Sequence, residues 1–134
     1  MISNFEPDVI IVGSGVAGLS AALEFRDKKV LILTKTSRFF SGSSPLAQGG
    51  IAASVGCDDS ANLHYNDTIK AGVYSGRSEQ IEFLTNSGKD VINDLLKLNM
   101  SFDYDSDGAL ERNREGAHSR RRVLKVGGDA TGLE

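Results

Sequence analysis

The feature that most constrains the fold is a strand–glycine–helix pattern near the N-terminus. Val9–Val12 is a short, continuously apolar and β-branched run, which is typical of a parallel strand buried on both faces. Residues 13–18 follow at once and contain three glycines, and residues 19–28 are rich in helix formers. A second apolar run, Val30–Leu33, completes the pattern. This order predicts a right-handed crossover between two parallel strands.

The three glycines have separate expected roles in this turn. Gly13 permits a tight turn out of the strand, Gly15 lets a pyrophosphate approach the backbone, and Gly18 lets the helix pack closely on the sheet. The phosphates then meet free N–H groups and the positive end of the helix dipole. Between two apolar runs within about 30 residues, this spacing indicates dinucleotide binding. The candidate cofactor-binding residues of the turn are Gly13, Ser14, Gly15, Val16, Ala17 and Gly18.

The end of the second strand leaves the identity of the dinucleotide open. Dinucleotide-binding folds usually place Asp or Glu about 20 residues after the glycines, where it holds the ribose hydroxyls. This chain has Thr34 and Lys35 there instead. A lysine at this point is compatible with the 2′-phosphate of NADP, with a contact to FAD, or with an exposed charge at the strand end. The motif alone does not choose between nicotinamide and flavin.

The sequence divides into four segments. Residues 8–35 form the expected βαβ unit, and residues 36–59 are a Ser-, Gly- and Asp-rich loop without helical or strand periodicity. A loop of that length inside a compact domain is uncommon unless it is functional. Residues 60–99 are expected to be helical, and residues 100–134 to form short strands and loops that are incomplete.

Within the helical segment, apolar spacing predicts three helices. They cover residues 61–73, 79–85 and 89–98. Ser78 has the position of an N-cap, and Gly88 is expected to separate the second helix from the third. Further along, Asp107 and Gly108 predict a hairpin turn.

Composition excludes several classes of protein. A chain of 134 residues fits one domain, and a formal charge of −3 gives no general attraction to nucleic acid or anionic lipid. The single cysteine, Cys57, rules out an intrachain disulfide, and neither it nor His64 has a partner at metal-ligand spacing, so no metal site is expected. No apolar run is long enough for a signal peptide or a membrane span. We therefore expect a cytoplasmic protein with no membrane association.

Three stretches carry a resemblance to a known family. They are Thr34-Lys35, the stretch of residues 43–53 that reads SSPLAQGGIAA, and residues 115–122, which read EGAHSRRR. Together they resemble the succinate dehydrogenase/fumarate reductase flavoprotein superfamily and, within it, the L-aspartate oxidase family. The resemblance implies an α/β fold, with a Rossmann-like FAD-binding βαβ unit and additional helices, ending before the substrate-capping domain. It adds as FAD contacts Lys35, Ser43, Ser44, Pro45, Leu46, Ala47, Gln48, Gly49 and Gly50.

The same resemblance implies that FAD is held non-covalently. Succinate dehydrogenases and fumarate reductases carry a histidine that is joined to FAD, and an ungapped alignment places Ser43 at that position. A serine cannot form this link. Gly49 and Gly50 permit a close approach of the backbone, so the loop can lie against the flat isoalloxazine ring.

Glu115 is the candidate substrate-binding residue. In the family, the matching glutamate is thought to orient L-aspartate through its ammonium group, and a carboxylate suits a cation better than it suits an amine-free dicarboxylate. The alternative is a surface glutamate paired with Arg112 or Arg114. His118 is expected to be a loop histidine, and residues 120–122 are expected to be structural or exposed. Residues 125–128 depart from the family pattern, so the resemblance does not imply the conformation of this loop.

The implied activity is oxidation of L-aspartate to iminoaspartate, with oxygen or fumarate as the acceptor. In the family this step begins NAD biosynthesis and feeds quinolinate synthase. Two alternatives remain: a fumarate reductase- or succinate dehydrogenase-like flavoprotein, and a non-catalytic module that binds NADP. The catalytic arginine and substrate-binding histidines of the family lie in later segments. This chain is therefore expected to be a piece of a longer protein and to be inactive alone.

Overall fold

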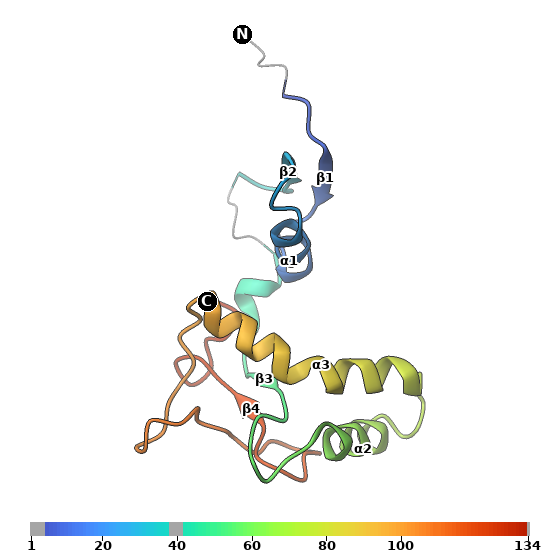
Figure 1. Ribbon diagram of the computed structural model, residues 1–134, viewed down its shortest axis with the longest axis vertical. Coiled ribbons are helices and arrows are strands. Elements are labelled where there is room, and N and C mark those ends of the chain that lie inside the picture. Colours follow the sequence, from blue (N-terminus) through green and yellow to red (C-terminus); the bar gives the residue numbers. More distant parts are fainter. Residues whose placement is uncertain (1–4, 38–41, 134) are drawn as a thin grey trace. The chain divides into compact units, whose positions relative to one another are not determined.

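The computed structural model describes residues 5–37 and 42–133. The described residues fall into two compact units, one within Met1–Ala47 and one within Gln48–Gly132, and each is described by itself. Figure 1 shows the elements of both. The first unit contains β1 (Val9–Val12), α1 (Val16–Glu24) and β2 (Val30–Leu33), followed by the short 3₁₀ helix η1 (Ser44–Leu46).

The first unit is the predicted crossover. β1 and β2 are parallel and pair in register from Val9 with Val30 to Val12 with Leu33. The connection between them contains α1, which contacts both strands. The helix begins at Val16, three residues before the predicted start, because the backbone turns helical directly after Gly15 at the N-cap. The strand–helix–strand order expected from the glycine pattern is confirmed.

The expectation that these strands are buried on both faces is wrong for this chain. Side chains along β1 alternate between half-buried and exposed, and Ile10 and Val12 are 58% and 83% exposed. The reason is that one helix covers only one face of a two-stranded sheet, whereas a run of apolar residues needs a covering layer on each side. Within the first unit no described element supplies the second layer.

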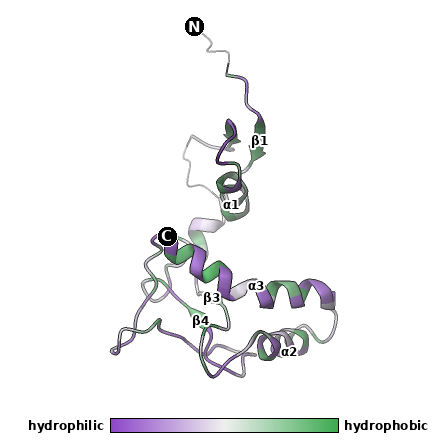
Figure 2. Ribbon diagram, in the orientation of Figure 1, coloured by the Kyte–Doolittle hydropathy of each residue, from purple (hydrophilic) through white to green (hydrophobic). Residues whose placement is uncertain are grey.

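The second unit packs two helices beside a small antiparallel sheet. α2 (Ala61–Ala71) and α3 (Ser78–Lys97) contact one another, and β3 (Ile51–Ala52) pairs with β4 (Val123–Leu124) (Figure 1). Figure 2 shows apolar and polar residues alternating along α3, as expected for a helix with one buried face. The buried apolar core consists of Ala53, Ile92, Phe102, Leu124 and Val126.

The structure corrects three further local predictions. α3 is one continuous helix through Gly88, not two, and it begins at Ser78, with Arg77 rather than Ser78 at the N-cap. One glycine costs a helix only about 1 kcal/mol, which does not outweigh the packing of the rest of α3. Gly88 lies beside β3, where a Cβ would be 3.4 Å from the Cβ of Ala53. The loop predicted for residues 36–59 also contains η1 and β3, which are too short to give a periodic signal.

Of two other local predictions, the end of the first predicted helix is wrong and the hairpin turn is confirmed. α2 ends at Ala71, short of the predicted residue 73, because Val73 and Tyr74 both adopt positive φ angles that a helix does not allow. The turn at Asp107-Gly108 is present: Tyr104 forms an antiparallel bridge with Leu110, and Gly108 has a φ of +77°.

Candidate functional site

The glycine turn after β1 has the geometry expected of a phosphate-binding turn. Gly13 has a φ of +110°, and its amide donates to the carbonyl of Leu33 at 2.8 Å, which joins the turn to β2. Gly18 packs on the same turn so closely that a Cβ would lie 2.1 Å from the carbonyl oxygen of Gly13. α1 therefore starts directly at the turn, with no acidic residue in its first turn. That arrangement presents backbone amides and the positive helix end to an anion.

Ser44 is the residue from the following loop that the structure brings to this turn. Its hydroxyl accepts a hydrogen bond from the amide of Val16 at 3.2 Å, and a Cβ at Gly15 would approach the same oxygen to 3.2 Å. η1 fixes this position, since Pro45 lies in its first turn and the amide of Ala47 donates to the carbonyl of Ser44 at 3.0 Å. The first amide of α1 thus already binds an oxygen acceptor, the kind of partner that a phosphate offers.

The other predicted contacts of the first unit are less defined. Lys35 follows β2 and is exposed, and Ser43 precedes η1 with its carbonyl accepting from the amide of Leu46 at 3.0 Å. Ala17 and Leu46 are exposed, whereas Ser14 is half-buried. These side chains are accessible to solvent, but their described contacts do not favour one ligand over another.

Gly49 and Gly50, predicted to approach the flavin, are held by the second unit in a way that the sequence did not reveal. A Cβ at Gly50 would lie 2.2 Å from the carbonyl oxygen of Leu124, so β4 requires a glycine here. Gly49 has a φ of +80°, its amide donates to Asp129, and its carbonyl accepts from Thr131 at 2.6 Å. The pair therefore has a packing role of its own. Gln48, next to it, is exposed.

Glu115 carries an ion pair, but not the one considered from the sequence. Its Oε1 lies 3.0 Å from the Nζ of Lys125, and the Glu115 side chain remains partly exposed. This hydrogen bond raises the pKa of Lys125. Arg112 pairs with Asp58 instead, at 2.8 Å, and Arg114 donates to the carbonyl of His118 at 3.0 Å. The alternative partners named for Glu115 were thus wrong.

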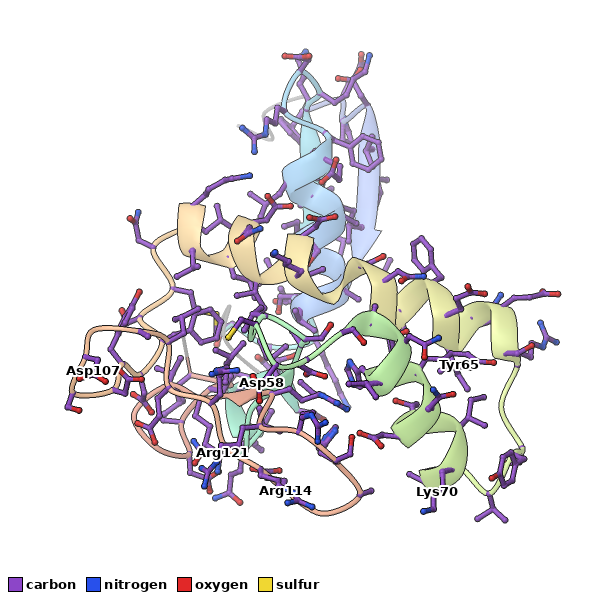
Figure 3. The ribbon with its side chains drawn as sticks, turned by 60° about the horizontal axis from the view of Figure 1, so that its bottom comes forward. Asp58, Tyr65, Lys70, Asp107, Arg114 and Arg121 are labelled. Carbon is purple, nitrogen blue, oxygen red and sulfur yellow. The ribbon has the colours of Figure 1, made fainter. Side chains whose placement is uncertain are left out.

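The three arginines at 120–122 have different environments. Arg120 and Arg121 are exposed, and Figure 3 shows Arg121 on the surface, whereas Arg122 is fully buried. Arg122 binds Asp59 through two contacts of 2.8 Å and Asp67 through one of 2.7 Å. For Arg122, the structural role expected from the sequence is confirmed.

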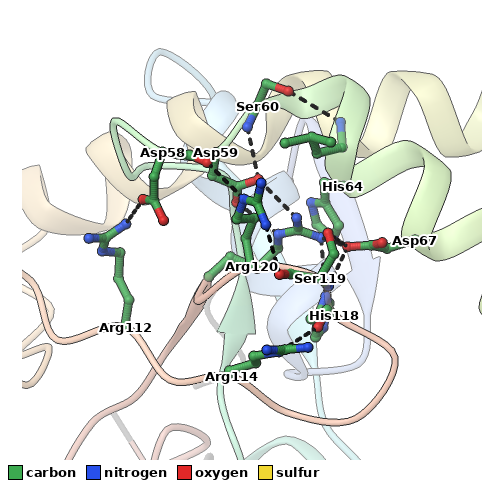
Figure 4. A network of polar contacts seen from close by, with 12 residues as sticks. Asp58, Asp59, Ser60, His64, Asp67, Arg112, Arg114, His118, Ser119 and Arg120 are labelled. Carbon is green, nitrogen blue, oxygen red and sulfur yellow. Dashed lines mark hydrogen bonds and ion pairs between the residues drawn. The ribbon is translucent and has the colours of Figure 1, made fainter.

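Around Arg122 lies a polar network that sequence reasoning missed (Figure 4). Asp67 accepts from the amide and the hydroxyl of Ser119, both at 2.7 Å, as well as from Arg122. Burial of Asp67 opposes its ionisation, but these hydrogen bonds outweigh it and lower its pKa to about 2. The network therefore fastens the segment that follows Glu115 to α2. The only sequence signal for it was the basic run itself.

Two histidines border this network. Arg122 Nη1 lies 3.3 Å from Nδ1 of His118, whose ring is 5.6 Å from that of His64. His64 is buried, and its Nδ1 has no hydrogen-bond partner in the part of the chain that the structure describes. Burial, and then the charge of Arg122, lowers the pKa of His64, which favours its neutral form.

Residues 125–128, where the sequence departs from the family pattern, have a defined structure. Gly127 and Gly128 both have positive φ, and their amides donate to the two carboxylate oxygens of Asp103, each at 2.8 Å. Over residues 5–37 and 42–133, no group of three or more His, Cys, Asp or Glu residues is placed to hold a metal ion. Nor is any helix in those ranges long and apolar enough to cross a membrane.

Comparisons with known proteins point to one family. The family described as "FAD binding domain" matches residues 8–133. The L-aspartate oxidase of Mesorhizobium japonicum is 42% identical over 125 residues, which are 93% of this chain and 24% of that protein. The L-aspartate oxidase of Streptomyces coelicolor is 42% identical over 129 residues, 95% of this chain and 22% of that protein.

A solved structure supports the same fold. The Mycobacterium smegmatis Sdh1 complex in the apo form contains a chain that matches with a TM-score of 0.87 and 33% identity, over 96% of this chain and 22% of that chain. This chain thus spans about a quarter of the length of the proteins it matches.

Proposed function

Because this chain belongs to the family of FAD-binding domains, we propose that its α1 turn holds the pyrophosphate of FAD non-covalently and that the longer protein oxidises L-aspartate to iminoaspartate. The observation that carries the cofactor site is the turn from Gly13 to Gly18. A Cβ at Gly18 would collide with the carbonyl oxygen of Gly13, and a Cβ at Gly15 would crowd the Ser44 hydroxyl at 3.2 Å, so both glycines are needed for the helix to start at the turn; the amide of Val16 there binds an oxygen acceptor. The residues present fit a pyrophosphate.

FAD, when bound, supplies the acceptor for a hydride equivalent, and the chain supplies binding and orientation. Ser43 has no ring nitrogen with which to form a covalent bond to the flavin, which supports non-covalent binding. Lys35 and the loop of residues 43–50 are proposed to contact the rest of the cofactor. Within that loop, Gly49 and Gly50 act first through the packing that fixes the backbone beside β4.

Glu115 is proposed to orient the substrate. Its carboxylate already binds one ammonium group, that of Lys125, at 3.0 Å, and remains partly exposed. The α-ammonium of L-aspartate is a cation of the same kind. The loop that carries Glu115 is anchored through Ser119 to Asp67, which holds the nearby backbone to α2. We further propose oxygen or fumarate as the electron acceptor, and quinolinate synthase as the consumer of the product in NAD biosynthesis.

A second candidate, oxidation of succinate or reduction of fumarate, is favoured by one observation. Lys125 neutralises Glu115, so an amine-free dicarboxylate meets less repulsion there than an unpaired carboxylate would cause. The likeness to the Sdh1 chain agrees with this candidate.

A chimera separates the two candidates. Residues 8–133 would replace the matching segment of the Mesorhizobium japonicum relative, and turnover of L-aspartate and of succinate would be compared with that of the parent protein. The proposal expects L-aspartate to be preferred and the flavin to be released by heat. Preferential oxidation of succinate would favour the second candidate, and flavin that stays attached after denaturation would contradict non-covalent binding.

A further inference from the structure

A hollow of about 470 Å³ lies on the second unit, between α2 and the loop that leads to β4. From α2 it is lined by Asp67, Lys70 and Ala71, and from the loop by Arg114, His118 and Ser119. None of these residues is among those proposed above to contact FAD or substrate. Figure 3 shows Lys70 at the end of α2 and Arg114 on the loop.

Two cations border the hollow without a matching carboxylate. Neither Lys70 nor Arg114 forms an ion pair with any residue in the described part of the chain. Arg114 is nevertheless positioned, because its Nε donates to the carbonyl of His118 at 3.0 Å. Its two Nη groups remain as donors, and a guanidinium held in this way is preorganised for a carboxylate or a phosphate.

The one acid in the lining is already engaged. A single carboxylate oxygen of Asp67, Oδ2, accepts from the Ser119 amide, the Ser119 hydroxyl and Arg122. The side chain of Asp67 is only 16% exposed. Asp67 is therefore engaged by the buried network and forms no ion pair with Lys70 or Arg114.

His118 provides a third donor. Its Nδ1 faces Nη1 of Arg122 at 3.3 Å, and because a guanidinium only donates, Nδ1 must accept. The proton of the neutral imidazole is then on Nε2, which is available as a donor. Lys70 on α2 and Arg114 on the loop carry positive charge, and His118 on the loop adds an N–H donor. Together these groups complement a compact dianion.

We propose that this hollow binds a small dianion, either a phosphate group or a dicarboxylate, through Lys70, Arg114 and His118. The site is separate from the proposed flavin contacts, and it does not depend on the substrate assigned to Glu115. Both classes of ligand present oxygens that a guanidinium and an ammonium bind in the same way.

The test is a titration of the ¹⁵N-labelled full chain, followed by NMR at constant ionic strength. Inorganic phosphate and succinate are the probes, and chloride is the reference. The proposal expects saturable shifts of the Ser119 and Lys70 amides with at least one dianion and not with chloride. Saturation by phosphate alone assigns phosphate groups, saturation by succinate alone assigns dicarboxylates, and saturation by both assigns a dianion site that does not distinguish them.

Substitutions make the test specific. Lys70→Gln and Arg114→Gln should each raise the dissociation constant about tenfold, because each removes one charge-assisted contact. Lys89→Gln removes an exposed cation of α3 that is not in the lining, and should leave binding unchanged. Arg114→Lys keeps the charge and should retain part of the affinity. Shifts that resemble those with chloride, or equal losses in Lys70→Gln and Lys89→Gln, would overturn the proposal.

Discussion

Arg122 and Asp59 form a two-point ion pair in which both side chains are fully buried. Nε lies 2.8 Å from Oδ2, and Nη2 lies 2.8 Å from Oδ1 (Figure 4). Asp59 precedes α2, whereas Arg122 directly precedes β4. A third contact from Arg122 reaches Asp67 on α2. One guanidinium thus fastens the start of β4 to α2 and to the residue just before its N-cap, across 55 and 63 positions of the sequence.

Arg122→Met should strongly destabilise the chain. The substitution leaves Asp59 buried without its counter-charge, and breaking a buried pair in this way typically costs about 3–5 kcal/mol of the free energy of unfolding. Urea unfolding measures the loss. Arg112→Met is the matched control, since its pair with Asp58 is partly exposed, and it should leave the unfolding free energy nearly unchanged. Equal losses in the two variants would show that Arg122 does not have the structural role described.

The stability of the chain should depend on Asp67 in acid. Its pKa in the folded state is about 2, below the ordinary aspartate value near 3.9, so ionised Asp67 stabilises the fold above pH ~4. This stabilisation, up to about 2 kcal/mol, is lost as the pH falls from ~4 through 2. Asp67→Asn should therefore flatten the fall of the unfolding free energy over that range. Asp107→Asn, which removes an exposed carboxylate from a turn, should retain the wild-type profile. A flattened profile in Asp107→Asn, with an unchanged one in Asp67→Asn, would contradict the role assigned to Asp67.

Gly50→Ala should destabilise the second unit by about 1–3 kcal/mol, because the new methyl group meets the backbone of β4. The added Cβ would lie 2.2 Å from the carbonyl oxygen of Leu124. Gly116→Ala is the control, since a Cβ there has no atom within 4 Å. Thermal unfolding of both variants checks the comparison. If Gly50→Ala unfolds at the wild-type temperature, the requirement for glycine beside β4 does not hold.

Glu115→Gln in the chimera should raise the KM for L-aspartate about tenfold, since the amide lacks the charge that binds an ammonium group. The KM for succinate, which has no ammonium, should change much less. Steady-state kinetics with both substrates provide the measurement. Lys125→Met should not raise the KM for L-aspartate, because it removes a competing cation from Glu115. Unchanged kinetics in Glu115→Gln would remove this residue from the substrate site.

The sequence predicted the parts of the fold that depend on local pattern. The apolar runs of β1 and β2 and the glycines between them give the crossover, because each signal lies within a few residues. The continuity of α3 was not predictable in the same way. Gly88 is an unfavourable helix residue by propensity, and α3 continues through it because tertiary packing, such as that of Ile92 in the core, outweighs this local cost.

In the candidate site too, local features were predictable from the sequence and long-range contacts were not. The phosphate-binding turn follows from Gly13, Gly15 and Gly18, whereas the hydrogen bond from Val16 to Ser44 joins residues 28 positions apart. The contacts of Arg122 with Asp59 and Asp67 span 63 and 55 positions. Hydrophobic periodicity carries no information about such pairs, since they depend on how the elements pack.

The most direct test of the cofactor assignment is a calorimetric titration of the flavin-free chimera with FAD and, separately, with NADP. The α1 turn is predicted to support saturable binding of one FAD per chain, with NADP producing no comparable heat. A chimera that purifies colourless and gives no heat with FAD, or that binds NADP in preference, would contradict the account.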